Sequence, residues 1–160
     1  MQDDDPIIPE AGYRQLVASV TSGEGRMCGI EGRRPDAENR YNVRAAYGDV
    51  PILIGHCAVF HRELLAHVFE CESHFLKAFG WLPRIYGDDI FLSYCALNLY
   101  GRMNLAIKTR VDRLPDPHAL SRHPNHLASR TKAMRCCQQL FWYPLNASPL
   151  GVQLLGRQFG

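Results

Sequence analysis

Apolar residues recur at helical spacing in four segments of the chain. The first covers residues 9–23, which open with a proline and close with a glycine. The others cover residues 62–80, 88–101 and 126–145, and the first two of these also close with a glycine. Proline is favoured at the start of a helix and glycine just beyond its end. These patterns predict four helices.

Strand-like patterns occupy most of the sequence between these helices. Residues 26–34 and 102–108 are short strand candidates, and residues 40–48 alternate as in a half-exposed strand. Residues 50–61 (VPILIGHCAVFH) are the richest in β-branched and apolar side chains, which predicts a central strand. Residues 109–125 are rich in Pro, Asp, Arg and His without periodicity, which predicts a long loop. Strands that alternate with helices indicate an α/β protein.

Length and charge narrow the class of protein. The 160 residues are enough for one domain with its own core, and a formal net charge of +2 gives no general reason to expect nucleic acid as a partner. Basic residues concentrate between residues 108 and 135, which favours an anionic ligand but also fits a solvated helix face. No apolar run approaches the roughly 20 residues that span a bilayer. The six cysteines contain no C-x-x-C pair, which argues against structural zinc.

Two clusters of aspartate stand directly before predicted helices. Asp3–Asp5 precede the first helix, and Asp88 and Asp89 begin the third. Carboxylate oxygens suit Mg²⁺ or Mn²⁺, and these ions commonly bridge to the phosphates of a substrate. Each cluster also has a structural interpretation, because Asp3–Asp5 can form a solvated tail while Asp88 and Asp89 cap a helix.

Basic and aromatic residues complete the candidate site. His126 and Arg130 lie four residues apart and therefore on one face of the last helix. Cations of this kind neutralise the charge that develops on a departing diphosphate. Trp81 and Tyr86, just before the acidic pair, offer rings on which an acceptor sugar can stack. The combination indicates a nucleotide-sugar transferase, whereas a metal-dependent phosphodiesterase would use the same residue types around two ions.

The order of these segments resembles that of the exostosin-like glycosyltransferases (glycosyltransferase family 64), which have the GT-A fold. The resemblance is carried by QDDDPII, GIEGRR, ILIGHCAVFHRELL, GDDIFLSYCALNLYGR, HLASR and the closing RQFG. It implies a mixed sheet flanked by helices in a single partial domain over residues 1–160. This domain would run from the D-x-D motif to the domain end, without the N-terminal Rossmann-like half of the fold.

The acidic start would then be the metal site. In the resemblance, Asp5 corresponds to the residue that binds Mn²⁺ or Mg²⁺ directly. Asp3 corresponds to the residue that assists through the ribose of the nucleotide or through a metal-bound water. Asp4 belongs to the same cofactor-binding segment.

Five further residues receive roles from the resemblance. Asp89 corresponds to the catalytic carboxylate beside the donor sugar and the acceptor, with Asp88 as its neighbour. Arg130 corresponds to the residue that contacts the diphosphate, and His126 supports it. Arg33 would lie near the donor site.

The activity that the resemblance implies is transfer of a sugar from a UDP-sugar to a carbohydrate acceptor with retention of configuration. An N-acetylhexosamine is one candidate sugar. Relatives of this kind work in the secretory pathway (Golgi or endoplasmic reticulum), and the chain would then belong to a longer, membrane-anchored protein. The alternatives are a truncated, non-catalytic remnant of such a domain and a metal-dependent phosphodiesterase.

Overall fold

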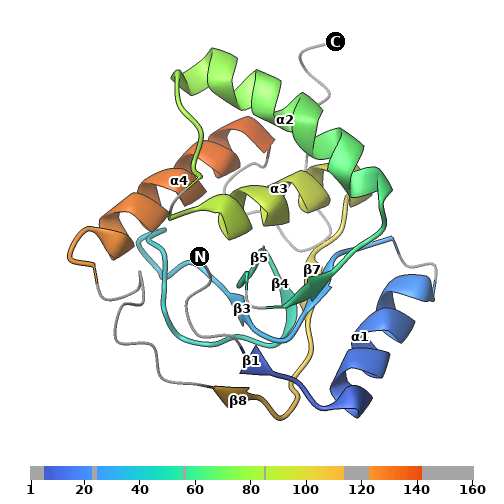
Figure 1. Ribbon diagram of the computed structural model, residues 1–160. Coiled ribbons are helices and arrows are strands. Elements are labelled where there is room, and N and C mark those ends of the chain that lie inside the picture. Colours follow the sequence, from blue (N-terminus) through green and yellow to red (C-terminus); the bar gives the residue numbers. More distant parts are fainter. Residues whose placement is uncertain (1–5, 23–24, 56, 85, 114–122, 142–160) are drawn as a thin grey trace.

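The computed structural model describes residues 6–22, 25–55, 57–84, 86–113 and 123–141. The helices in these ranges are α1 (Glu10–Thr21), α2 (Glu63–Phe79), α3 (Asp88–Tyr100) and α4 (His126–Phe141) (Figure 1). The strands are β1 (Pro6–Ile7), β2 (Cys28–Gly29), β3 (Gly32–Arg33), β4 (Gly48–Val50), β5 (Ile52–Leu53), β6 (Ala58–Val59), β7 (Asn104–Ala106) and β8 (Asp112–Arg113). None of the helices described is long and apolar enough to cross a membrane.

Four of the strands form a mixed sheet in the order β4-β7-β2-β6. The inner strands β2 and β7 run parallel, with Cys28 opposite Leu105. The edge strands β4 and β6 run antiparallel to their neighbours. β3 pairs with β5, and β1 pairs with β8, as two separate antiparallel ladders. The predicted α/β class with a mixed sheet is therefore confirmed.

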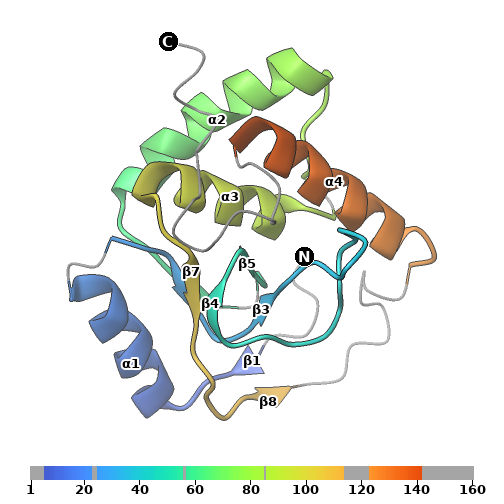
Figure 2. The same cartoon turned by 180° about the vertical axis from the view of Figure 1, so that it is seen from behind.

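Helices cover the strands from two sides. α2, α3 and α4 pack together on one side, and α1 lies apart from them on the other (Figures 1 and 2). The larger hydrophobic core includes Phe75, Tyr94 and Met134 of the three-helix side, all fully buried. A smaller core joins α1 to the sheet. α3 lies deepest, because eight of its residues are buried, and these include Asp89 in its first turn.

The predicted helix ends agree well with the structure at two glycines. α2 ends at Gly80 and α3 at Gly101, where φ is 72° and 65°. Residues that carry a side chain rarely adopt this left-handed backbone conformation, so glycine is favoured there. α1 ends at Thr21, close to the predicted end. The predicted last helix extends to residue 145, and its final four residues lie outside the described ranges.

The predicted central strand at residues 50–61 is wrong as a continuous element. It is divided among the end of β4, β5 and β6, and neither β4 nor β6 lies in the centre of the sheet. Pro51 has no N–H to donate to a ladder, and its carbonyl instead accepts a hydrogen bond from the Asn104 side chain at 2.9 Å. The apolar run therefore marks burial, which holds for residues 50–54.

Two other strand predictions need correction. Residues 26–34 contain two strands, β2 and β3, that belong to different ladders. Residues 40–48 form no strand before β4 begins at Gly48, apart from one bridge between Ala46 and Gly32. The prediction at residues 102–108 is confirmed by β7, although β8 follows it and β7 lies inside the sheet.

Candidate functional site

Asp89 and Arg130 meet in the interior of the protein. Arg130 Nη2 donates a hydrogen bond to Asp89 Oδ2 at 2.6 Å, and the two side chains are only 9% and 8% exposed. Arg130 Nη1 also donates to the carbonyl oxygen of Tyr86 at 3.2 Å. This buried pair joins the first turn of α3 to α4 across 41 residues of sequence.

The Asp89 carboxylate accepts two further donors. Its Oδ1 accepts the backbone N–H of Ile90 at 2.8 Å, and its Oδ2 accepts that of Gly55 at 3.4 Å. The N-cap of α3 is Gly87, with no side-chain capping hydrogen bond. The capping interpretation holds only in part for Asp89: its Oδ1 accepts a first-turn N–H, but its Oδ2 faces Arg130 and Gly55, two residues beyond β5. The positive end of the helix dipole still favours a carboxylate in this turn.

A buried tyrosine packs against the same arginine. The Arg130 guanidinium lies 4.3 Å from the centre of the Tyr41 ring, which is only 7% exposed. Burial raises the pKa of the Tyr41 hydroxyl, while the positive charges of Arg130 and Arg33 act to lower it. Arg33 pairs with Glu31, Nη2 to Oε1, at 2.5 Å, which makes a second arginine–carboxylate pair whose positive charge acts on Tyr41.

Both arginines keep a hydrogen-bond donor without a partner. The Nε atoms of Arg33 and Arg130 are buried, and neither has a partner among the described residues. A buried donor left in this state costs about 1–3 kcal/mol, so such groups usually have a ligand, water or functional explanation. A guanidinium group with a spare N–H donor is suited to an oxygen-rich anion.

The other predicted site residues lie around this centre. Asp88 is exposed at the start of α3, where partial loss of solvation and the negative charge of Asp89 raise the pKa of its carboxyl group. The His126 ring lies 6.1 Å from the Tyr86 ring, edge to face. His126 and Arg130 thus both face the loop before α3, as their spacing predicts.

The predicted metal site, Asp3, Asp4 and Asp5, lies outside the described residues, which begin at Pro6 in β1. Within the described ranges no group of three or more His, Cys, Asp or Glu side chains could hold a metal ion. The metal site therefore remains a prediction. The segment next to it is held by the pairing of Pro6 and Ile7 with β8.

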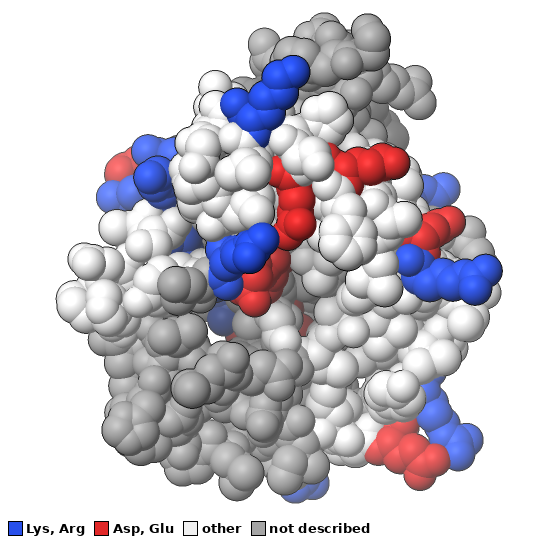
Figure 3. All heavy atoms as spheres, turned by 45° about the horizontal axis from the view of Figure 1, so that its top comes forward, with Lys and Arg blue, Asp and Glu red and all other residues white. Residues whose placement is uncertain are grey.

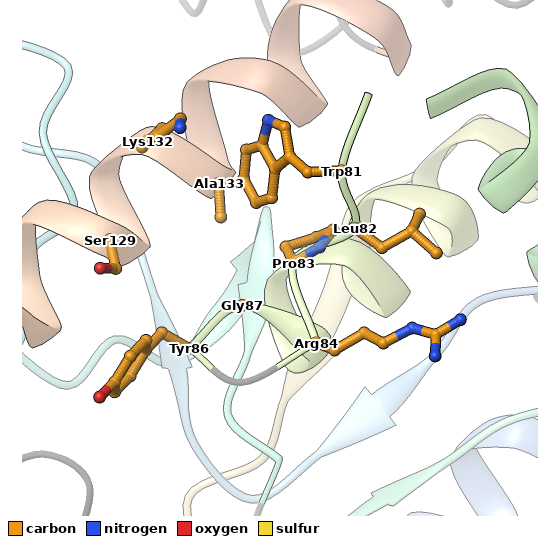
Figure 4. A pocket seen from close by; sticks show the side chains of 9 residues that line it. All are labelled: Trp81, Leu82, Pro83, Arg84, Tyr86, Gly87, Ser129, Lys132 and Ala133. Carbon is orange, nitrogen blue, oxygen red and sulfur yellow. The ribbon is translucent and has the colours of Figure 1, made fainter. Parts of the chain in front are cut away.

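A pocket of about 280 Å³ lies between α4 and the loop that leads into α3 (Figure 4). It is lined by Trp81, Leu82, Pro83, Arg84, Tyr86, Gly87, Ser129, Lys132 and Ala133. Trp81 and Lys132 lie toward one end, with the Lys132 ammonium 4.6 Å from the ring centre, and Tyr86 lies toward the other. Since the Tyr86 carbonyl binds Arg130, the pocket adjoins the buried pair. Aromatic faces beside polar groups are suited to a ring-shaped polar ligand.

No model of a known protein family, no curated protein and no solved structure matches this chain.

Three basic residues of the region between residues 108 and 135, all on α4, make contacts within the protein. On α4, Arg130 binds Asp89, Lys132 lies over Trp81, and Arg135 donates to the carbonyl oxygens of Glu38 and Asn39. On the face seen in Figure 3, basic and acidic side chains lie among uncharged ones without a large described patch of one sign. Among the described residues, the candidate for anion binding is the buried Arg130 with its unpartnered Nε donor.

Sequence reasoning missed two residues of this cluster. Glu31 lies two residues before Arg33, which places both side chains on one side of an extended segment. This spacing could have predicted their ion pair. Tyr41 gave no such signal. It lies in the segment that was predicted to be a half-exposed strand, and its burial against α4 depends on contacts distant in sequence.

Proposed function

We propose that this chain is the C-terminal part of an exostosin-like, metal-dependent glycosyltransferase with the GT-A fold. Its reaction would transfer a sugar from a UDP-sugar to a carbohydrate acceptor. The observation that carries the proposal is the buried Asp89–Arg130 pair, in which Arg130 keeps an unpartnered Nε donor. A carboxylate and a spare guanidinium donor at one place are what a sugar joined to a diphosphate requires.

Arg130 and Arg33 would bind the diphosphate oxygens through their spare N–H groups. As the bond from the anomeric carbon to the diphosphate breaks, negative charge grows on the leaving oxygen, and fixed cations lower the barrier to this step. A mutation that removes one such donor typically costs a factor of about 10²–10³ in turnover. Arg130 is the stronger candidate of the two, because it is also fixed by Asp89 and Tyr86.

Asp89 would orient the donor sugar and stabilise positive charge at the anomeric carbon. Arg130 and two backbone N–H groups already donate to its oxygens, so it is poorly arranged to remove a proton. In the same-face displacement, the acceptor oxygen forms the new bond as the diphosphate leaves. The acceptor proton passes to the leaving phosphate oxygen. No protein base is then needed.

Asp5 and Asp3 would hold Mn²⁺ or Mg²⁺, for which carboxylate oxygens are suitable ligands. The ion would neutralise charge on the diphosphate. The pocket between Trp81 and Tyr86 is the proposed place for the acceptor, because it adjoins Arg130 and has two aromatic walls.

Calorimetry with UDP and Mn²⁺ on the full-length protein tests the proposal. We expect binding that requires Mn²⁺ and is lost in Asp5→Ala, whereas Glu10→Ala, an exposed control on α1, binds as the wild type. Absence of Mn²⁺-dependent UDP binding by the wild type would end the proposal.

A transfer assay tests the role of Asp89. Asp89→Asn keeps a side-chain oxygen that can accept from Arg130 Nη2, so it should keep UDP binding while sugar transfer falls by a factor of at least about 10². A variant with normal turnover removes Asp89 from the mechanism. Hydrolysis of a phosphodiester in place of sugar transfer would favour the phosphodiesterase alternative.

A further inference from the structure

We propose that Tyr41 is a positioning residue for Arg130, held in place by the loop of residues 36–41, which is fixed to α4. Its ring would hold the guanidinium in the orientation that binds a diphosphate. This inference rests on the proposed function, because it assigns that ligand to Arg130.

The loop of residues 36–41 is fixed to one face of α4 by side chains of both segments. Asn39 and Gln138 exchange two amide hydrogen bonds, at 2.9 and 3.0 Å. Arg135 donates to the carbonyl oxygen of Asn39 at 3.1 Å, and Thr131 Oγ1 accepts the backbone N–H of Tyr41 at 3.1 Å. Thr131, Arg135 and Gln138 share one helix face because they are four and three residues apart.

The loop also has its own internal structure. The Asp36 carboxylate accepts the backbone N–H groups of Glu38 at 3.0 Å and Arg40 at 2.8 Å. Asn39 has φ of 55°, and among the described residues it is the one non-glycine with positive φ. Asparagine is one of the few residues that adopt this conformation. A backbone in this conformation persists where its surroundings hold it, and here the amide pair with Gln138 does so.

Stacking adds to the hydrogen bonds that orient Arg130, and the Tyr41 hydroxyl also lies close enough to interact with the guanidinium. All five N–H groups of a guanidinium lie in its plane, whereas an aromatic ring contacts its face. Asp89 and the Tyr86 carbonyl accept from the two terminal nitrogens, and Tyr41 covers one face at 4.3 Å. The Nε donor stays unpartnered. Tyr41 therefore limits rotation of the guanidinium and leaves an N–H for the ligand.

The test compares three variants of the full-length protein. Tyr41→Leu removes the ring, Tyr41→Phe removes only the hydroxyl, and Tyr47→Leu is a matched control at an exposed tyrosine that Lys108 approaches to 5.9 Å. Loss of the cation–π contact should raise the Kd of UDP with Mn²⁺ about tenfold in Tyr41→Leu. Tyr47→Leu should bind as the wild type does, and Tyr41→Phe, which keeps the ring and loses only the hydroxyl contact with Arg130, should bind more tightly than Tyr41→Leu.

Nuclear magnetic resonance of the arginine Nε–H groups supplies a readout that needs no ligand. The ring current of Tyr41 should displace the Arg130 signal, and Tyr41→Leu should abolish that displacement while Tyr41→Phe preserves it. Should Tyr41→Leu fold poorly, Asn39→Gly replaces it, because glycine keeps the positive φ and loses only the amide pair. Asn39→Gly should weaken UDP binding in the same direction, by a smaller factor.

The outcomes separate the two proposals. Wild-type UDP affinity and an unchanged Arg130 signal in Tyr41→Leu overturn the positioning role and leave the proposed function intact. Failure of the wild type to bind UDP overturns the proposed function and with it the diphosphate assignment. In that case the Arg130 signal still shows whether the ring orients the guanidinium.

Discussion

Two arginine–carboxylate pairs in this protein have the same N–O distance of 2.6 Å and very different surroundings. On α1, Arg14 and Glu10 are 78% and 77% exposed, whereas Arg130 and Asp89 are 9% and 8% exposed. An exposed pair four residues apart contributes about 0.3–0.5 kcal/mol. A buried pair gives up the solvation of both charges, so it contributes little net stability but is costly to break. Environment, and not distance, decides what each pair does.

Breaking the buried pair should have the largest effect. Arg130→Met leaves Asp89 buried without its cation, and we expect the free energy of unfolding to fall by about 3–5 kcal/mol. The matched change Arg14→Met on α1 should cost less than about 0.5 kcal/mol. Urea denaturation of both variants measures the difference.

The double variant Asp89→Leu/Arg130→Met sharpens this prediction. Since it removes both buried charges, it should regain most of the stability that Arg130→Met loses. A double variant as unstable as the single one would show that the loss comes from side-chain packing or from the Asp89 hydrogen bonds to Ile90 and Gly55, and not from an uncompensated charge.

A substitution that forces α4 away from the start of α3 should cause the next largest loss in the free energy of unfolding. A Cβ at Gly87 would lie 2.7 Å from the Ala133 Cβ and 3.1 Å from the Pro83 Cβ, so Gly87→Ala forces a shift and should cost about 1–3 kcal/mol. Adding Ala133→Gly should recover part of this. Gly55→Ala, whose Cβ would meet the Asp89 Cβ at an ordinary 3.4 Å, is the control. Thermal unfolding of the three variants distinguishes them, and equal losses at Gly55 and Gly87 would contradict the steric explanation.

The two arginine–carboxylate pairs should also differ in how strongly salt weakens their coupling free energy, although this effect is smaller. At about 1 M salt the screening length is about 3 Å, which removes most attraction between exposed charges but little between buried ones. In double-mutant cycles, the coupling of about 0.3–0.5 kcal/mol between Arg14 and Glu10 should vanish. The coupling between Arg130 and Asp89 should persist. Two equally salt-sensitive couplings would mean that water reaches the buried pair.

The smallest effect concerns Asp88, the exposed neighbour of the buried pair. Its pKa is raised above the ordinary 3.8, so the folded state binds this proton more tightly than the unfolded state does. Asp88 therefore lowers stability as pH rises from about the unfolded value through the folded one. Asp88→Asn should unfold at a slightly higher temperature than the wild type at pH 7. This advantage should disappear at pH 3, and calorimetric scans at both pH values check it.

Local patterns in the sequence predict the helices well and the strands poorly. Gly80 and Gly101 end their helices in a left-handed conformation that glycine favours, so the glycine itself marks the helix end in the sequence. The apolar run at residues 50–54 shows that these residues are buried, but its pairing depends on Pro51 and on partner strands elsewhere in the chain. The sequence patterns thus give burial and helix ends, and strand pairing needs the whole fold.

In the candidate site, too, some features follow from local sequence patterns and others depend on contacts between distant segments. The His-x-x-x-Arg spacing correctly places His126 and Arg130 on one face of a helix, next to the loop before α3. The inward direction of Asp89 depends on Arg130, which lies 41 residues away in the sequence. The position of Tyr41 depends on an amide pair that spans 99 residues, which no local pattern shows.

The pairing of β1 with β8 has a consequence for the order of folding. Pro6 lies opposite Arg113, over a hundred residues further along the chain, whereas α2 and α3 are packed neighbours joined by a short loop. Contacts between near segments close small loops and form early, and those between distant segments pay a larger entropic cost first. We expect the three-helix side to assemble first. Any activity that needs Asp3–Asp5, directly before β1, should then appear last during refolding.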